Sequence, residues 1–533
     1  MIDMECRERE LSRHNCCFEE VQSMLSRIMS YGLTGLTGFP VTVEVDIGYG
    51  MTKFETVGLP DNAVKESRER VRSAIINSGF NFPETRIIAN LAPADIRKEG
   101  SIYDLPIAVG ILCACGEIKN WSVEDWVIIG ELALDGSVRG VNGVLPMIID
   151  AKARGYTKVL LPKENAAEAM YIDGVTAIPV SSLAEAAMFL RGDKHIDPQP
   201  LTVWRAEQVE YDADFALIKG QQSAKRAAEV AAAGGHNILF IGTPGSGKTM
   251  LARSIPSILP PLTHEEALEI TKIHSVAGIM RGKNNIVTER PFRSPHHSAS
   301  IPSLVGGGAR ALPGEISLAH YGVLFLDEFA EFPKMVLEAL RQPMEDGVIT
   351  ISRTAAKADY PANFMLVAAM NPCPCGNFGS RTKPCKCTKY QIERYLGRIS
   401  GPVLDRIDIH VEMTDVDYDD ITSKQLGESS AAVRERVTKA REIQHRRYID
   451  DGIIMNSQLS SKLVKKHCIL EDDAEQLVKL SFTRLNLSAR AYNRILKVAR
   501  TISDLAGDER ITRAAIAEAL QYRSVDSKYW GAE

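Results

Sequence analysis

Alternation of apolar and polar residues gives the first structural signal in the chain. Residues 41–47, VTVEVDI, alternate in the manner of a half-buried strand. The segments RIIANLAPADI (86–96), WVIIGEL (126–132) and KVLLP (158–162) predict further apolar strands. The small-residue run LPIAVGIL at 105–112 predicts a helix between them. Together these elements predict an α/β domain.

A helix is predicted to begin after Asp61, in DNAVKESRERVRSAIINSGF. Asp61 suits the N-cap position, and Gly79 suits the end of the helix. Val64, Val71 and Ile75 recur on one stripe, which we expect to face the core.

In the second half of the chain, three apolar runs end at residues that can carry chemistry. The run 238–241 leads into a glycine-rich loop and then a helical pattern. The run in GVLFLDEFAEF (322–332) ends at an Asp-Glu pair, and FMLVAAMNP (364–372) contains Asn371 at the end of its strand. Open α/β sheets bind ligands at the carboxyl ends of their buried parallel strands, and these residues are expected to lie there.

Changes in pattern divide the chain into segments. Residues 1–23 are charged and unlike the rest, and they predict a disordered leader. Residues 191–212 are polar, contain two prolines and predict a linker. Between and beyond these we expect an α/β domain at 24–190, a second α/β domain at 213–415 and a helical domain at 416–533.

Composition narrows the class of protein. The chain has 533 residues, of which 45% are hydrophobic and 25% charged, as in ordinary globular proteins of several domains. Since no apolar run can cross a bilayer and the N-terminus lacks a signal-peptide core, we expect a cytoplasmic protein with no membrane partner. The net charge of −5 means that any nucleic-acid contact must come from a local basic segment.

The strongest motif is a phosphate-binding loop. It satisfies G-x-x-x-x-G-K-[ST] between a strand and a helix, so its backbone N–H groups can surround phosphates of ATP. Lys248 would neutralise the phosphate oxygens, and the Thr249 hydroxyl would coordinate Mg²⁺. The loop consists of Gly242, Thr243, Pro244, Gly245, Ser246, Gly247, Lys248 and Thr249.

Three further residues are candidates for ATP chemistry. Asp327 would hold the Mg²⁺ water shell, and Glu328 would polarise the attacking water. Asn371 could hydrogen-bond that water and sense the γ-phosphate.

A cysteine-rich segment, NPCPCGNFGSRTKPCKCT, follows Asn371. Its four thiols form two C-x-C pairs, and four thiolates suit tetrahedral Zn²⁺. Four free thiols in a loop are the alternative, and the sequence leaves both open. The residues are Cys373, Cys375, Cys385 and Cys387.

The order of these motifs, with LDRIDIH and a later Arg-bearing helix, resembles AAA+ ATPases. RPFRSPHHSASIPSLVGGGARALPGEISLAHYGVLFLDE and RYLGRISGPVLDRIDIHVEM are similar to the ComM/YifB family of magnesium-chelatase-like competence proteins. The resemblance runs from Met24 nearly to the C-terminus. It implies an AAA+ core with a parallel sheet and helices at 213–415, and a helical lid at 416–533.

The resemblance also assigns arginines. Arg406 matches the arginine finger, which reaches the ATP of a neighbouring subunit and so implies a homo-hexameric ring. The alternative for Arg406 is a surface ion pair with Asp405 or Asp408. Arg490 matches the sensor-2 arginine of the lid, and Arg494 is the competing candidate.

Two basic loops are candidates for DNA contact. In ITISRTAAK (349–357) two short extended runs flank a bend with Arg353 and Lys357, and the resemblance implies a pore-facing hairpin. LVGGGARALPG (304–314) is a glycine-rich insert with Arg310. Cations repeated around a ring would bind phosphates without sequence preference. Without the resemblance, both loops read as solvated turns.

The N-terminal region resembles the proteolytic domain of Lon-type proteases, through GELALDGSVRGVNGVLPMIIDAKARGYTKVLLPKENAAEA. Its catalytic serine should lie within 98–108, where Ser101 is shifted, and its lysine should follow Gly143, where VLPM stands. We therefore expect a catalytically inactive Lon-like domain.

The resemblance implies an ATP-dependent DNA translocase or helicase that promotes branch migration during recombination and natural transformation, with ATP, Mg²⁺ and single-stranded or branched DNA as its ligands. A magnesium-chelatase-like metal-insertion motor and a Lon-type ATP-dependent protease are the alternatives. A non-catalytic DNA-binding scaffold is disfavoured by the ATPase residues from Lys248 to Arg406.

Overall fold

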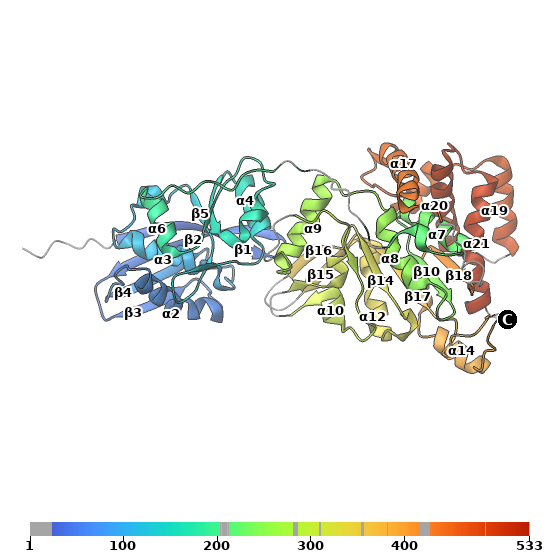
Figure 1. Ribbon diagram of the computed structural model, residues 1–533, viewed down its shortest axis with the longest axis horizontal. Helices are drawn as coiled ribbons and strands as arrows, with labels where there is room; N and C mark the ends of the chain where they lie inside the picture. Colours follow the sequence, from blue (N-terminus) through green and yellow to red (C-terminus); the bar gives the residue numbers. More distant parts are fainter. Residues whose placement is uncertain are drawn as a thin grey trace, which may run out of the picture. The chain divides into compact units, whose positions relative to one another are not determined.

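The computed structural model describes residues 24–202, 204, 211, 213–280, 286–308, 311–352, 357–380, 382–415, 427–484 and 487–531. They form two compact units (Figure 1). The first comprises the described residues of Met1–Trp204 and of His274–Ile286, and the second comprises those of Arg205–Ile273 and Val287–Glu533. The predicted leader at 1–23, Arg310 and Arg353 lie outside the described residues.

A seven-stranded mixed sheet forms the centre of the first unit, in the order β3-β4-β2-β1-β5-β8-β9. Its helices are α2 (Asn62–Asn77), α3 (Asp104–Ala114), α4 (Val144–Ala153), α5 (Ala166–Ala169) and α6 (Leu183–Arg191), and β6 (Glu131–Leu132) and β7 (Val138–Arg139) form a small hairpin. The strands of the sheet are β1 (Met24–Thr34), β2 (Thr37–Gly48), β3 (Lys53–Val57), β4 (Arg86–Ala92), β5 (Trp126–Ile128), β8 (Lys158–Pro162) and β9 (Thr176–Val180).

Local sequence explains the start and orientation of α2. The Asp61 carboxylate accepts a hydrogen bond from the backbone N–H of Val64 at 2.8 Å, which satisfies a donor that the first helical turn leaves free. Val64, Val71 and Ile75 are all fully buried. The predicted cap and apolar stripe are both confirmed.

The chain returns to the first unit after the start of the second. Helix α9 (His264–Val276) begins in the second unit, and its residues from His274 belong to the first. There the Ser275 carbonyl accepts from the N–H of Gly143 at 3.1 Å, and the Ser275 hydroxyl donates to the buried Glu168 carboxylate.

A five-stranded parallel sheet organises the second unit, in the order β11-β14-β17-β10-β18 (Figure 1). Because β10, β14 and β17 are adjacent and parallel, the residues that follow them meet at one edge. The strands are β10 (Ile238–Gly242), β11 (Phe292–Arg293), β14 (Val323–Leu326), β17 (Met365–Met370) and β18 (Ile409–Met413).

Helices surround this sheet and form the C-terminal region. Those within the sheet region are α7 (Gln222–Gly234), α8 (Lys248–Ile258), α10 (Ile301–Val305), α11 (Glu315–Leu318), α12 (Lys334–Ala339), α13 (Arg341–Asp346), α14 (Lys389–Leu396) and α15 (Gly401–Leu404). The C-terminal helices are α17 (Ser430–Tyr448), α18 (Ser461–His467), α19 (Asp472–Arg484), α20 (Ala489–Ala506) and α21 (Arg513–Trp530). The fold class predicted from the sequence, mixed α/β with a parallel-sheet core and a helical C-terminal region, is confirmed.

One buried carboxylate ties the C-terminal helices together. Asp504 on α20 accepts hydrogen bonds from Arg447 of α17 at 2.5 and 3.0 Å and from Arg500 of its own helix at 3.1 Å. Asn456 donates to the same carboxylate at 2.8 Å. Several donors compensate the loss of hydration of this charge.

Two small hairpins lie between strands of the sheet in the sequence. β15 (Val348–Ser352) pairs antiparallel with β16 (Lys357–Pro361) directly before β17, where the sequence predicts a hairpin. β12 (Gly306–Gly307) pairs with β13 (Leu312–Pro313) in the glycine-rich insert.

Candidate active site

The phosphate-binding loop connects β10 to α8. Gly245 and Gly247 adopt positive φ angles of 85° and 90°, and Gly247 is the N-cap of α8. A side chain would strain both positions, so glycine here lets the loop turn tightly into the helix. The N-terminus of α8, with its unpaired N–H groups, is suited to bind phosphate.

Lys248 is the buried cation of this loop. Its ammonium group donates to the carbonyls of Gly242 at 2.7 Å and Thr243 at 2.9 Å, and it lies 3.3 Å from Asn371 Oδ1. Burial lowers the pKa of Lys248 to about 8, and Asp327 opposes that shift. An anionic phosphate beside the ammonium group would favour its charged form and raise this pKa again.

The candidate Mg²⁺ ligands are adjacent. The Thr249 hydroxyl donates to Asp327 Oδ2 at 2.8 Å. A hydroxyl and a carboxylate are oxygen ligands of the kind that Mg²⁺ prefers. The structure therefore brings together Lys248, Thr249, Asp327 and Asn371 from three adjacent strand ends.

Glu328 occupies a strained backbone position at the same edge. It adopts φ 53° and ψ 43°, the left-handed region, which is uncommon for a non-glycine residue and costs roughly 1–3 kcal/mol. Its Oε2 lies 2.8 Å from Nδ1 of His297, which follows β11. Nothing in the sequence distinguishes His297, because a histidine in a loop carries no periodic signal.

The candidate arginines lie apart from the phosphate-binding loop. Arg406, Arg490 and Arg494 line a cavity of about 690 Å³, whose lining includes neither the loop residues 242–249 nor Asp327. The structure thus separates the arginines from the phosphate site of the same chain.

These arginines differ in their surroundings. Arg406 contacts Glu345 and donates to the Pro402 carbonyl at 2.6 Å, so neither ion pair considered from the sequence is present. Arg494 is 7% exposed and pairs with Asp405 at 2.9 Å. Arg490 is exposed, and among the described residues no hydrogen bond or ion pair holds its side chain. Arg490 is therefore the freer of the two sensor-2 candidates.

The same cavity contains a cation that sequence reasoning missed. The Arg441 guanidinium donates to the Ala232 carbonyl at 2.7 and 3.1 Å. Burial lowers the pKa of Arg441 to about 9, and the positive charge of Arg290 adds to that effect. Arg441 lies among many basic residues of α17, so composition does not distinguish it.

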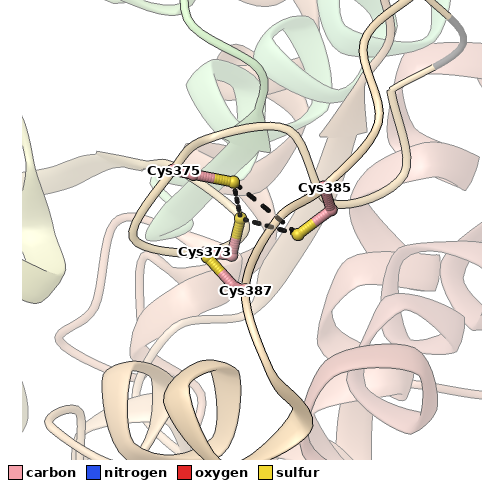
Figure 2. A group of neighbouring side chains, drawn as sticks. All are labelled: Cys373, Cys375, Cys385 and Cys387. Atoms are coloured by element: carbon pink, nitrogen blue, oxygen red, sulfur yellow. Dashed lines mark hydrogen bonds between the residues drawn. The ribbon is translucent and has the colours of Figure 1, made fainter.

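The four cysteines of the CxC pairs form one cluster (Figure 2). The Cys373 sulfur lies 3.4 Å from that of Cys375 and 3.7 Å from that of Cys385, and the Sγ atoms of all four, including Cys387, are within 4.8 Å of one another. Hydrogen bonds from the backbone N–H groups of Lys386 and Asn377 lower the pKa of Cys375 to about 6. Converging sulfurs with a stabilised thiolate fit a metal ion.

The cysteine segment packs against the phosphate-binding loop. A Cβ on Gly376 would approach the Pro244 ring to 2.7 Å. Asp415 accepts hydrogen bonds from Thr243 at 2.5 Å and from Ser380 at 2.9 Å. The position of this segment and that of the loop are therefore linked.

The two hairpins form one structure in the second unit. The Tyr360 hydroxyl of β16 donates to the Ala311 carbonyl at 2.9 Å, and Gly306 approaches Ile351 so closely that a Cβ would lie 2.8 Å from its Cδ1. Lys357 begins β16 and is exposed. The DNA-contact predictions for Arg353 and Arg310 fall outside the described residues.

In the first unit, the expected protease positions have other contacts. Ser101 donates to Glu131, and Gly143 is followed by the buried residues of α4. Asp104 accepts from Arg70 at 2.7 and 3.1 Å. Burial raises the pKa of Asp104 to about 6, against the lowering effect of Arg70.

Three regions of the chain match known protein families. Residues 214–421 match the family described as magnesium chelatase, subunit ChlI. Residues 43–165 match the one described as subunit ChlI of Mg-chelatase, and residues 427–523 match its C-terminal family. The ATPase motifs and the C-terminal helices thus lie in regions that match the chelatase families.

Individual relatives match almost the whole chain. The uncharacterized protein YifB of Salmonella typhimurium is 45% identical over 494 residues, covering 92% of this chain and 96% of its own. The YifB protein of Escherichia coli is 45% identical over 506 residues, covering 94% and 97%. The competence protein ComM of Haemophilus influenzae is 44% identical over 511 residues, covering 94% and 98%. This chain belongs to the ComM/YifB family. Membership of this AAA+ group implies binding of ATP and Mg²⁺. In the part of the chain that the structure describes, no helix is long and apolar enough to cross a membrane.

Proposed function

We propose that this protein is an ATP-dependent DNA translocase that acts in the cytoplasm as a hexameric ring and promotes branch migration during recombination and natural transformation. The observation that carries the proposal is the separation of Arg406 and Arg490 from Lys248 within one subunit. Membership of the family that includes the competence protein ComM supports the DNA-related part.

The separation supports an assembly of subunits. Phosphoryl transfer requires cations around the γ-phosphate, and an arginine supplied by a neighbouring subunit is a common source. A cavity rich in arginines, away from the phosphate-binding loop of its own chain, suits the face that meets the loop of the next copy. Such a head-to-tail contact closes into a ring when the rotation per subunit allows it.

Each residue then has a role in hydrolysis. Lys248 and the N–H groups of the loop bind the phosphates, and Thr249 and Asp327 would hold Mg²⁺, which neutralises charge that develops on the transferred group. Glu328 orients and polarises the attacking water, and Asn371 hydrogen-bonds that water beside the γ-phosphate. Arg406 and Arg490 of the adjacent subunit stabilise the transition state.

DNA contact is assigned to the two packed hairpins. Lys357 begins β16, and in the sequence Arg353 falls between β15 and β16 and Arg310 between β12 and β13. Sixfold repetition would line a channel with cations despite a net charge of −5 per chain. These cations would bind single-stranded or branched DNA in a salt-dependent and sequence-independent manner.

We further propose that the cysteine cluster binds a structural Zn²⁺. Zinc bound to four thiolates is typically tetrahedral, and the four sulfurs come from one short segment. The ion would fix this segment where Gly376 and Asp415 contact the phosphate-binding loop.

The alternatives are a metal-insertion motor and an ATP-dependent protease. The chelatase family match supports the first in its ATPase part, and a porphyrin-dependent increase in ATPase activity would favour it. The contacts of Ser101 and the missing lysine after Gly143 give the second no support.

The test measures ATPase activity and branch migration on a mobile DNA junction, with and without single-stranded and forked DNA, for wild type, Lys357→Ala and Arg353→Ala. DNA is expected to stimulate the wild type and to stimulate both variants less, while their basal hydrolysis persists. Lys462→Ala, an exposed substitution in α18, is the control. Absence of any DNA effect on the wild type would refute the proposal.

A further inference from the structure

Asn237, the residue directly before β10, is bonded through its side chain to two segments that are distant in the sequence. Its Nδ2 donates to the backbone carbonyl of Arg406 at 2.9 Å, and its Oδ1 accepts from the backbone N–H of Leu366 in β17 at 2.8 Å. An asparagine amide has one donor end and one acceptor end, so these two bonds fix its orientation. The side chain therefore ties the backbone at Arg406 to the parallel sheet.

The backbone of Asn237 holds the residues that follow Arg406. Its carbonyl accepts hydrogen bonds from the N–H groups of Asp408 and of Ile409, each at 3.1 Å. Ile409 begins β18, which pairs with β10 from Ile238 onward. Asn237 thus contacts the Arg406 segment through both its side chain and its main chain.

The preceding residue, His236, anchors the same segment to a C-terminal helix. Its ring is buried, with Nδ1 3.0 Å from Asp408 Oδ2 and Nε2 2.7 Å from Thr501 Oγ1 of α20. Buried polar groups keep such partners because leaving one unpaired costs free energy. The backbone around Arg406 is therefore held from the sheet and from α20 together.

The guanidinium of Arg406 is held less firmly than its backbone. It contacts Glu345, whose side chain is 58% exposed, and donates to the Pro402 carbonyl at 2.6 Å. An ion pair with an exposed partner contributes little to stability. The guanidinium can therefore exchange this carboxylate for a phosphate, whereas the start of the side chain stays where Asn237 holds it.

Asn237 is also linked to the phosphate-binding loop of its own chain. β10 runs from Ile238 to Gly242, the first residue of that loop. A substitution at Asn237 can thus act in two ways, by moving Arg406 or by disturbing the loop. The first impairs hydrolysis at the site of the neighbouring subunit and the second impairs the subunit's own site, so mixed rings separate them.

We propose that Asn237 is a positioning residue for ATP hydrolysis, which sets the backbone at Arg406 so that this arginine reaches the ATP of the adjacent subunit. The inference rests on the proposed function, because only a shared site gives Arg406 a phosphate to contact. It adds the residue that fixes the geometry of the donated arginine. Asn237 acts through Arg406 and not on ATP, since both of its side-chain bonds are to the backbone.

The experiment uses full-length protein and compares wild type with Asn237→Asp, Asn237→Ser and Asn77→Asp. Aspartate keeps the acceptor for Leu366 but cannot donate to the Arg406 carbonyl, and serine is one bond shorter and does not reach it. Serine introduces no charge, so the test does not depend on one variant folding. Asn77 is exposed in the first unit and donates to the Leu134 carbonyl at 2.6 Å, so Asn77→Asp is the matched control.

Both Asn237 variants are expected to lose about tenfold in kcat, equivalent to about 1.4 kcal/mol in the barrier, because a displaced Arg406 no longer stabilises the transition state. KM for ATP and binding of a fluorescent ADP analogue should change little, since Lys248 and its loop are intact. Size-exclusion chromatography with light scattering checks that each variant assembles as the wild type does. Asn77→Asp should match the wild type throughout.

Mixed rings then identify the affected site. Lys248→Ala subunits have an intact Arg406 segment, so mixing them with Asn237→Asp should raise activity above the mean of the two variants alone. Arg406→Ala subunits supply no finger, so their mixture with Asn237→Asp should show no such gain. The opposite pattern, a gain with Arg406→Ala and none with Lys248→Ala, would show that Asn237 acts on its own loop and would overturn the inference.

A further mixture distinguishes failure of this inference from failure of the proposed function. If Lys248→Ala and Arg406→Ala restore activity to each other, but Asn237→Asp is not rescued by Lys248→Ala or keeps the wild-type kcat, the inference is wrong and the shared site stands. If no pair of variants recovers activity in rings that contain both, the shared site and the role of Asn237 are both refuted.

Discussion

Arg494 of α20 pairs with Asp405 at 2.9 Å, and Asp405 directly precedes Arg406 in the sequence. This contact joins a C-terminal helix to the loop of the candidate arginine finger. Arg494 also lies 3.4 Å from the Leu404 carbonyl through its Nη1. The position of Arg406 therefore depends on a helix that is distant in the sequence.

Substitution of Arg494 by alanine should reduce kcat for ATP through displacement of Arg406. Loss of a hydrogen bond to a charged partner corresponds to about 1.5–3 kcal/mol, so we expect roughly a tenfold to hundredfold decrease. Nucleotide affinity should persist, because Arg494 is remote from Lys248. Steady-state kinetics and equilibrium ADP binding distinguish these effects, and an equal loss of ADP binding would contradict this assignment.

A mixture of two inactive variants should recover activity if adjacent subunits share each site. Lys248→Ala removes the phosphate cation, and Arg406→Ala removes the finger. In mixed rings, some interfaces pair an intact loop with an intact Arg406, so partial ATPase activity should return. The mixture is compared with each variant alone at the same total concentration. Zero recovery in rings that demonstrably contain both variants would rule out a shared site.

The stability of the nucleotide-free protein should respond to the charge of Lys248. Burial lowers its pKa to about 8, whereas an unfolded chain restores the ordinary value near 10.5. Between these values the unfolded state binds more protons, so the contribution of Lys248 becomes more favourable as pH rises from about 8 to about 10.5. Below pH 8 Lys248 is charged in both the folded and the unfolded state, so the folded protein bears the full free-energy cost of burying that charge.

Lys248→Met should therefore stabilise the nucleotide-free protein at pH 7 by about 1–3 kcal/mol. The gain should shrink towards pH 10.5, and the variant should lose ATP binding. Thermal and denaturant unfolding at several pH values measure the gain in stability. The control is Lys462→Met, a substitution at an exposed site. A gain that grows with pH would contradict the expected sign.

The cysteine cluster should bind one zinc ion per chain. Cys375→Ser with Cys385→Ser should abolish binding, because two of four ligands are lost. Metal analysis of the purified protein and titration with a chromogenic chelator measure the stoichiometry. Cys115→Ser, at an exposed cysteine outside the cluster, is the control. Equal metal content in all variants would show that the cluster is a set of free thiols.

Loss of the Asp504 carboxylate should destabilise the C-terminal helices. Arg500, which is 1% exposed, and Arg447 would lose their buried partner. Removal of one member of a buried ion pair costs about 3–5 kcal/mol. Denaturant unfolding of Asp504→Ala and of the control Glu442→Ala, a substitution at an exposed site on α17, gives the difference between their free energies of unfolding. A difference below 1 kcal/mol would show that other groups satisfy both arginines.

Local patterns were sufficient to predict which residues of the candidate nucleotide site lie together. The glycines, Lys248 and Thr249 follow one apolar strand, and Asp327 and Asn371 follow two others, so a parallel sheet was enough to predict that they meet. The Asp61 cap was predicted for the same reason, because it depends on residues close together in the sequence, whereas the family resemblance implied the hairpin ahead of β17. The roles of Arg406, Arg490 and the hairpin cations came from family resemblance and remain proposals.

The sequence by itself determined the sheet, the phosphate-binding loop and the residues at its edge, since periodicity and turn chemistry act over a few residues. Only the tertiary structure decided that Glu328 contacts His297, that Arg494 holds the residue before Arg406, and that His274–Ile286 belongs to the first unit. These relationships join residues 31 positions apart (His297 and Glu328), 89 apart (Arg494 and Asp405) and 107 apart (Ser275 and Glu168), where side-chain packing rather than local preference selects the partner.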